Sequence, residues 1–169
     1  SKKVMLGPHV AGWSICRPPS RGRICRAPCR RCETTSGTEV AFYVDASALV
    51  KLVVAESETE ALRAWLEGPG RELVACDLAR TELMRLVRRA VPDRVLRARE
   101  VLDAVTLVHV TSAVFEEAGR LDPSGLRSLD AIHLAAALDL GDDLEGLITY
   151  DDRLAAAAVS NGVAVVAPR

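Results

Sequence analysis

From residue 40 to the end of the chain, short apolar runs alternate with longer segments in which apolar residues recur every three or four positions. Runs such as residues 40–44 and 73–76 have the length of strands, and they lack the strict polar and apolar alternation of a strand with one wet face. Such strands, separated by helices, are typical of a parallel sheet that is covered by helices on both sides. The pattern therefore predicts a three-layer α/β/α fold with a mostly parallel central sheet.

The predicted elements follow one another in a regular order. We expect strands at residues 40–44, 73–76, 106–110, 147–150 and 163–167. We expect helices at residues 46–54, 58–66, 78–90, 92–104, 112–120, 128–140 and 152–160. Turn-forming residues such as Gly68-Pro69-Gly70 separate several of these segments and mark where a helix must end.

The overall composition points to a single soluble domain. At 169 residues the chain is long enough to bury about two-thirds of the surface of its unfolded state, and its hydrophobic content of 49% with 27% charge suits a real core. No apolar stretch approaches the roughly 18 residues of a membrane span, and the basic start lacks the apolar region of a signal peptide. We therefore expect a cytoplasmic protein that does not enter a membrane.

Residues 1–39 differ from the rest of the chain. They carry eight basic and two acidic residues and are rich in Pro, Gly and Cys, whereas residues 40–169 carry 14 basic and 21 acidic residues. The spacing of Cys25, Cys29 and Cys32 is a weak indication of zinc, because the residues between them offer almost nothing to bury. We expect an unstructured leader, either translated sequence ahead of a true start near Val40 or a basic tail that binds nucleic acid nonspecifically.

Two carboxylates stand where predicted strands end, and two more lie near the starts of predicted helices. Asp45 follows the first strand and Asp151 follows the fourth, while Glu82 and Asp130 lie in or near first helical turns. The carboxyl ends of parallel strands meet at one edge of a sheet, where ligands of such folds bind. Ordinary alternatives exist for each, since Asp45 can cap a helix, Asp130 suits a helix start, and Glu82 can be a surface residue.

Four carboxylates at one edge would repel one another and raise their own pKa values unless a cation neutralised them. A site made only of carboxylate oxygens and water suits Mg²⁺ or Mn²⁺ far better than Zn²⁺. A metal held in this way lowers the pKa of a bound water and aligns a phosphodiester with it. The sequence therefore predicts a divalent cation site.

The acids lie in four short motifs. These are Val44-Asp45-Ala46-Ser47, Thr81-Glu82-Leu83, the block from Ser128 to Ala135 (SLDAIHLA) and Thr149-Tyr150-Asp151. In order and spacing they resemble the four acidic motifs of PIN-domain ribonucleases, with the greatest likeness to the VapC toxins of bacterial toxin–antitoxin pairs. The resemblance covers about residues 40–169 and implies a PIN-like fold, a cognate antitoxin protein and a homodimer.

The resemblance also implies a role for individual residues. Asp45, Glu82, Asp130 and Asp151 match the catalytic, metal-binding acids of the family. Ser47 matches the small polar residue that orders the first Asp, and Thr149 is expected to donate a hydrogen bond to the acids from behind. For Asp152 a helix cap is the expected role, with metal binding in place of Asp151 as the alternative. His133 is expected to pack in the core beside Ile132 and Leu134 rather than to act as a base.

Positive charge that could hold RNA is concentrated in one segment. Seven of the 14 basic residues after position 39 fall within residues 80–99. They are Arg80, Arg85, Arg88, Arg89, Arg94, Arg97 and Arg99. Guanidinium groups bind phosphates with two parallel hydrogen bonds, although several of these arginines are expected to be ordinary solvated residues. Arg85, one helical turn from Glu82, is the residue that we expect to contact a phosphate.

The hypothesis from the sequence is a Mg²⁺-dependent endoribonuclease, the toxin of a VapBC-type module, which hydrolyses RNA phosphodiesters with metal-activated water. The alternative is a catalytically inactive PIN-like module that binds or regulates through an acidic cation site. A phosphorelay receiver domain would need a Lys near the last strands, and the only Lys after the leader is Lys51. A haloacid-dehalogenase-like phosphatase would need an acid where Ser47 stands.

Overall fold

A parallel sheet of five strands forms the centre of residues 40–169, which are the residues that the computed structural model describes. The strands are β1 (Val40–Val44), β2 (Arg71–Cys76), β3 (Thr106–Val108), β4 (Leu144–Ile148) and β5 (Val165–Val166). They are arranged in the order β3-β2-β1-β4-β5, and each neighbouring pair is parallel. The predictions for the leader, including its cysteines, lie outside the described residues.

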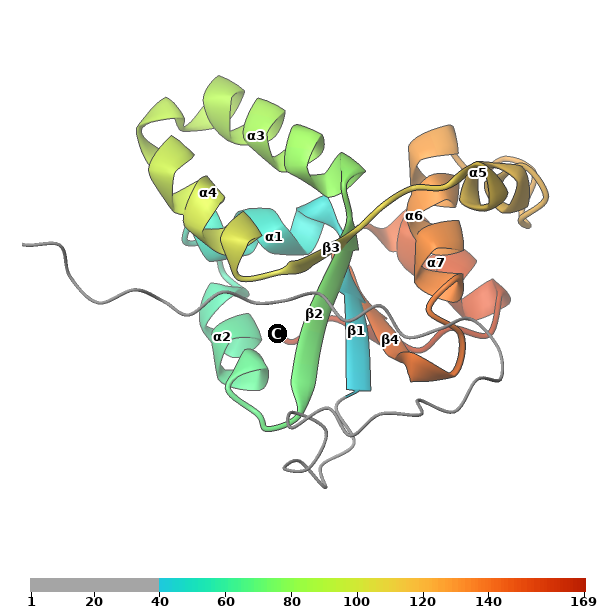
Figure 1. Cartoon of the computed structure of the whole chain (residues 1–169). Helices are drawn as coiled ribbons and strands as arrows, with labels where there is room; N and C mark the ends of the chain where they lie inside the picture. The colour runs from blue at the N-terminus through green and yellow to red at the C-terminus, as the bar shows by residue number, and fades with distance from the viewer. Residues whose placement is uncertain (1–39) are drawn as a thin grey trace, which may run out of the picture. The chain divides into compact units, whose positions relative to one another are not determined.

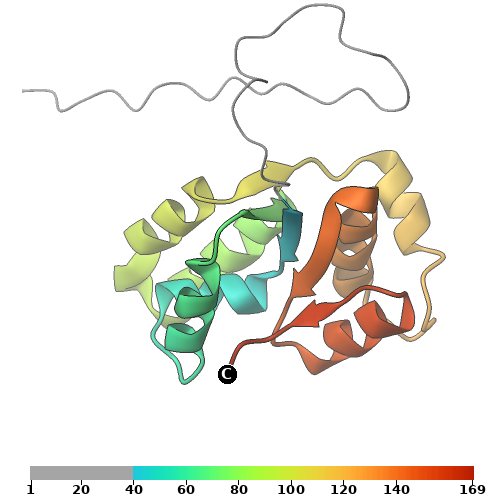
Figure 2. The same cartoon turned by 90° about the horizontal axis from the view of Figure 1, so that it is seen from below.

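Within residues 40–169, seven helices cover the two faces of this sheet (Figures 1 and 2). One face carries α1 (Ala46–Val53), α2 (Thr59–Leu66), α3 (Leu78–Ala90) and α4 (Val95–Asp103). The other face carries α5 (Ser112–Ala118), α6 (Ser128–Leu138) and α7 (Asp152–Ser160). Two 3₁₀ turns, η1 (Pro92–Arg94) and η2 (Gly141–Asp143), precede α4 and β4. The predicted three-layer α/β/α fold with a parallel sheet is thus confirmed.

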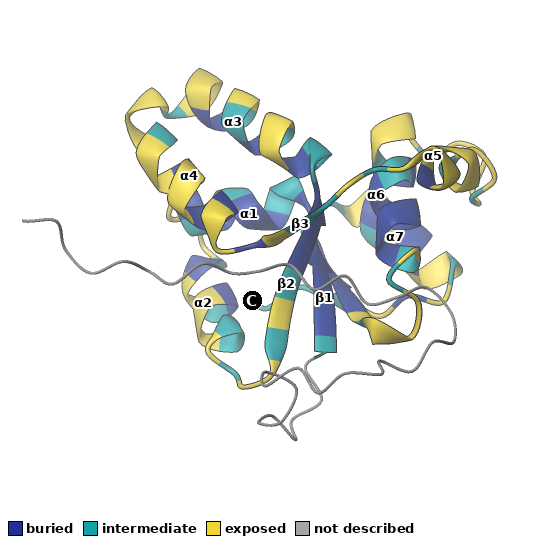
Figure 3. Cartoon of the chain, in the orientation of Figure 1, coloured by how far each residue is buried: buried dark blue, intermediate teal, exposed yellow. Residues whose placement is uncertain are grey.

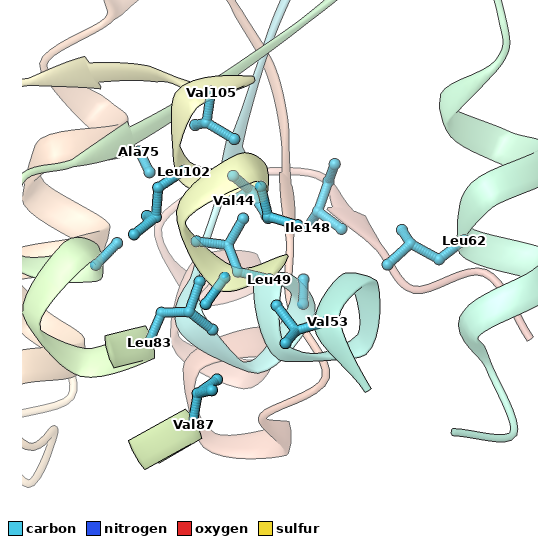
Figure 4. Packing of buried hydrophobic residues seen from close by; sticks show 14 of the residues in the cluster. Val44, Leu49, Val53, Leu62, Ala75, Leu83, Val87, Leu102, Val105 and Ile148 are labelled. Atoms are coloured by element: carbon cyan, nitrogen blue, oxygen red, sulfur yellow. The ribbon is translucent and has the colours of Figure 1, made fainter. Parts of the chain in front are cut away.

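Each central strand supplies side chains to two separate cores, because successive residues of a strand point to opposite faces. Phe42 and Val44 of β1 pack into the core beneath α1–α4, part of which Figure 4 shows, whereas Tyr43 packs beneath α5–α7. In β4, Ile148 joins the first core and Leu147 the second. Burial on both faces explains why β1 is apolar along its whole length and why β2 and β4 are buried over their last three residues, as the dark parts of the central strands in Figure 3 show.

The predicted elements are all present, with small shifts at their ends. Strand β4 begins at Leu144 and ends at Ile148, earlier than predicted, because Leu144 pairs with Ala41 before the register of the pair shifts. The helix predicted for residues 92–104 is divided, since Pro92 opens a 3₁₀ turn from which α4 continues. Within residues 40–169, no helix combines the length and the apolar character that crossing a membrane requires.

The two leucines of α4 provide a matched test of this packing. Leu102 is 4% exposed in the first core, whereas Leu96 on the same helix is 71% exposed. We expect Leu102→Ala to lower the free energy of unfolding by about 2–5 kcal/mol, because it removes buried methyl groups and leaves a cavity. Leu96→Ala should stay within about 0.5 kcal/mol of the parent. Urea unfolding of the full chain measures both, and equal losses would contradict the arrangement of α4.

Candidate metal-binding site

Asp45 lies at the junction of β1 and α1 and is held by three hydrogen bonds. Its Oδ1 accepts from the backbone N–H of Ala48 at 3.1 Å and from the hydroxyl of Ser47 at 2.7 Å. Its Oδ2 accepts from the hydroxyl of Thr149 at 3.1 Å. Asp45 therefore does cap α1, and the same side chain, only 6% exposed, is fixed in one orientation at the sheet edge.

The hydroxyls of Ser47 and Thr149 link the first and fourth strand ends. Besides its bond to Asp45, the Ser47 hydroxyl accepts the backbone N–H of Tyr150 at 2.8 Å. The Thr149 hydroxyl accepts the backbone N–H of Asp151 at 3.1 Å. Each hydroxyl thus holds Asp45 on one side and the segment that carries Asp151 on the other.

Asp151, rather than Asp152, is the N-cap of α7. Its Oδ1 accepts from the backbone N–H groups of Arg153 and Leu154, at 2.8 and 3.2 Å. Asp152 is the first residue of the helix and is exposed. The capping role expected for Asp152 is therefore wrong, because Asp152 already lies inside α7 and the extended backbone that a cap requires is that of Asp151.

Asp130 lies in the first turn of α6, half-buried, and is the acid with the fewest partners. Its Oδ2 is buried and has no hydrogen-bond partner among residues 40–169. Burial raises the pKa of Asp130, and the charges of Asp151 and Glu82 add to that rise, while Arg127 and His133 oppose it. The carboxylates of α3, α6 and the β4–α7 junction therefore act on one another electrostatically. Burial likewise raises the pKa of Asp45, against the hydrogen bonds from Ser47, Ala48 and Thr149.

Glu82, in α3, contacts a residue that the sequence assigned only to the core. The Nε2 of His133 lies 2.6 Å from Glu82 Oε2, and the imidazole is 3% exposed. Burial alone would lower the pKa of His133, but hydrogen bonds with Cys76 and Glu82 outweigh it and raise that pKa. The expected packing of His133 in the core is correct, yet its link to Glu82 was missed. The spacing of Asp130 and His133, three residues apart on one helix face, is the signal that could have indicated it.

These acids fit a hard cation that keeps part of its water shell. Among residues 40–169, no three His, Cys, Asp or Glu side chains converge closely enough to hold an ion by themselves. Mg²⁺ does not require such a cage, since it is usually bound by one or two carboxylates with waters in its remaining positions. The unpartnered Oδ2 of Asp130 is the atom that such an ion would satisfy. The oxygen-only donor set favours Mg²⁺ or Mn²⁺ over Zn²⁺.

Arginines line two hollows beside these acids. Arg85, Arg88 and Arg89 line a groove of about 870 Å³ that also includes Glu82. Arg127 and Arg153 line a second pocket, of about 260 Å³, that includes Asp130.

The five arginines of these hollows differ from several others in their ion pairs. Within the described part of the chain, no carboxylate lies within salt-bridge distance of any of the five. In contrast, Arg63 and Arg97 are each paired with a glutamate on their own helix, and Arg120, just beyond α5, is paired with two glutamates of that helix. Arg127 and Arg153 were missed in the sequence, because they are isolated there and belong to no cluster of basic residues.

Several known proteins are similar to this chain. The model of the PIN domain family matches residues 42–160. The chain is 42% identical over 131 residues to Ribonuclease VapC47 of Mycobacterium tuberculosis, a match that covers 75% of this chain and 96% of that protein. It is 45% identical over 128 residues to Ribonuclease VapC46 of the same species, covering 76% and 98%. A chain of a toxin-antitoxin complex from Klebsiella pneumoniae has a similar fold, with a TM-score of 0.58 at 22% identity, covering 75% and 97%.

Because the pKa of Asp130 is raised in the folded state, its charge opposes folding at neutral pH when no cation is present. We expect Asp130→Asn to raise the melting temperature at pH 7 in EDTA. The gain should shrink as the pH falls toward 3.8, the ordinary pKa of an aspartate, because the parent carboxyl is then protonated as well. Thermal melts from pH 3 to 8 would measure this effect.

The exposed Asp152 provides the control for that experiment. Asp152→Asn should leave the melting temperature in EDTA nearly unchanged at every pH. Added Mg²⁺ should stabilise the parent more than Asp130→Asn, because a ligand stabilises the state that binds it. Equal stabilisation of the parent and of Asp130→Asn by Mg²⁺ would show that Asp130 does not bind the ion.

Proposed function

We propose that this chain, which belongs to the PIN-domain family and to its VapC ribonucleases, is a divalent-metal-dependent endoribonuclease. We further propose that it is the toxin of a toxin–antitoxin pair. The observation that carries the metal requirement is the buried, unpartnered Oδ2 of Asp130, on a carboxylate that feels the charges of Asp151 and Glu82. The names of the curated relatives favour an enzyme over the alternative of an inactive binding module.

The four acids would hold the ion, which is Mg²⁺ or Mn²⁺. When bound, such an ion lowers the pKa of a coordinated water and neutralises charge on the phosphate that is cleaved. The hydroxyls of Ser47 and Thr149 keep both oxygens of Asp45 in place. The carboxylate is therefore already fixed in orientation before the cation binds. The two N–H bonds to Asp151 Oδ1 leave its second oxygen available. Preorganised ligands of this kind keep the reorganisation cost of binding low.

RNA would be held by the arginines on either side of the acids. Arg85, Arg88 and Arg89 occupy the groove beside Glu82, and Arg127 with Arg153 the pocket beside Asp130. Because no described carboxylate pairs with them, their guanidinium groups can bind phosphates without first breaking an ion pair. A strand that crosses the acids could thus be gripped on both sides of the phosphate that is cleaved.

A cleavage assay of the full chain tests the proposal. Purified protein should cut total RNA with Mg²⁺ or Mn²⁺ and not with EDTA. Asp45→Asn, which keeps the shape of the side chain, should lower the rate by more than about 100-fold, because even an outer-shell partner of a metal is worth about 10–100-fold. Asp152→Asn is the matched control and should cut at nearly the parent rate. Cleavage that persists in EDTA, or in Asp45→Asn, would refute the proposed chemistry.

The arginines can be tested separately from the chemistry. We expect Arg85→Ala to raise KM roughly tenfold, the equivalent of about 1.4 kcal/mol, with little change in kcat. In the inactive Asp45→Asn protein, it should also reduce the slope of log affinity against log salt by about 0.7, the value for one phosphate contact with a single strand. Arg97→Ala is the control, since Arg97 is paired with Glu100 at 3.1 Å. An equal effect of both substitutions would show that only net charge matters.

The partners of this protein would be a cognate antitoxin and a second copy of the chain. It would act on RNA in the cytoplasm. The VapC relatives and the similarity to a chain of a toxin-antitoxin complex support the antitoxin.

A further inference from the structure

A chain of polar groups runs through the core beneath α5–α7 and ends at Glu82. The backbone N–H of Cys76, at the end of β2, donates to the Tyr43 hydroxyl at 3.2 Å. That hydroxyl lies 2.9 Å from His133 Nδ1, and His133 Nε2 lies 2.6 Å from Glu82 Oε2. Groups from β1, β2, α6 and α3 thus form one continuous hydrogen-bonded path.

Burial of this hydrogen-bonded path costs free energy, and packing of the core does not require it. Tyr43 and Cys76 are fully buried and His133 nearly so, among apolar neighbours such as Leu134 and Leu147. A phenylalanine and a leucine could fill similar volumes without burying a hydroxyl and an imidazole, each of which costs free energy unless it is hydrogen-bonded. Every polar atom of the two side chains is matched, and the path leads to a carboxylate at the candidate site.

We propose that His133 is a positioning residue that holds Glu82 in the orientation in which it binds the divalent cation, and that Tyr43 fixes the imidazole in turn. The inference rests on the proposed function only in taking Glu82 as one of the metal-binding acids. A glutamate on a helix surface has several rotatable bonds, and metal sites rely on such outer partners to orient their ligands.

The direction of the bonds supports this role. An ionised carboxylate only accepts hydrogen bonds, so Nε2 of His133 carries the hydrogen toward Glu82 in either protonation state of the ring. The other ring nitrogen faces the Tyr43 hydroxyl, and the imidazole is therefore fixed at both ends. With 3% exposure and Nε2 already engaged, His133 does not touch substrate and acts through Glu82.

The four acids differ in how each is held, and Glu82 is the one held by a side chain from the core. Asp45 is oriented by two hydroxyls and a backbone N–H, and Asp151 by two backbone N–H groups. Asp130 has one oxygen without a partner. Glu82 is bonded only to His133 among the described residues, so its position depends on that ring.

Binding of Mn²⁺ to the full chain, followed by electron paramagnetic resonance, tests this inference without reference to cleavage. The variants are Tyr43→Phe, His133→Leu, Glu82→Gln and the double variant His133→Leu/Glu82→Gln. We expect His133→Leu to weaken Mn²⁺ binding about 10- to 100-fold, as outer partners of metal ligands do, and Tyr43→Phe to weaken it less. The double variant should bind no more weakly than Glu82→Gln alone, because His133 acts only through Glu82.

Tyr150→Phe is the matched control, since it removes the other tyrosine hydroxyl of the chain, which donates to the carbonyl of Pro168 at 2.9 Å. It should leave Mn²⁺ binding unchanged. Thermal melts show which variants are folded. If His133→Leu does not fold, Tyr43→Phe still decides the question. A Tyr43 hydroxyl with only a structural role would change the melting temperature but not the Mn²⁺ affinity of the folded protein.

The outcomes separate the inference from the proposed function. Parental Mn²⁺ affinity in folded Tyr43→Phe and His133→Leu, or additive losses in the double variant, would overturn the positioning role. If the parent binds Mn²⁺ and the variants behave as expected but no RNA is cut, the proposed function fails while the positioning role stands. A parent that binds no Mn²⁺ overturns the role and the metal requirement together.

Discussion

The carboxylates at the carboxyl end of the parallel sheet repel one another and lose hydration when they are buried. Much of the surrounding structure reduces this free-energy cost. Burial raises the pKa values of Asp45 and Asp130, which means that the charged forms are disfavoured in the fold. Hydrogen bonds from Ser47 and Thr149 offset part of this cost at Asp45. At Asp130 one oxygen is left without such compensation among residues 40–169, and the cation of the proposed function would supply the missing partner.

The order of the strands explains why acids distant in sequence lie at the same edge of the sheet. Strand β1 lies between β2 and β4, so the segments that follow these three strands all emerge at one edge. They carry Asp45, Glu82 and Asp151, while α6, which packs against both β2 and β4, brings Asp130 to the same place. Hydroxyls then connect the β1 and β4 ends, and the path from Tyr43 to Glu82 connects the core to the edge. Core packing and site geometry are consequently coupled.

The sequence was most informative where a single local rule decides the outcome. Runs such as Phe42 to Val44 are apolar on both faces because each face has its own helix layer, and this pattern predicted the parallel sheet. The rule that parallel strands end at one edge placed Asp45 and Asp151 correctly. Which of two adjacent acids caps α7 was predicted wrongly, because a shift of one residue at the start of the helix exchanges the roles of Asp151 and Asp152.

Contacts between distant segments were beyond local rules. Glu82 and His133 are 51 residues apart, and they are neighbours only because α3 and α6, which cover opposite faces of the sheet, both reach its carboxyl edge. Arg127 and Arg153 likewise share a pocket because α6 and α7 lie side by side, whereas the sequence drew attention to the arginine cluster of α3 and α4. The sequence thus identified the kinds of residue in the site more readily than the partners that orient them.

The proposed function requires a divalent cation among the four acids. Anomalous X-ray diffraction from crystals of the full chain soaked in Mn²⁺ tests this most directly, because the signal locates the metal itself. We expect a peak bounded by Asp45, Glu82, Asp130 and Asp151, with Asp130 Oδ2 among the ligands of the metal. A peak elsewhere on the protein, or none at Mn²⁺ concentrations that support RNA cleavage, would contradict it.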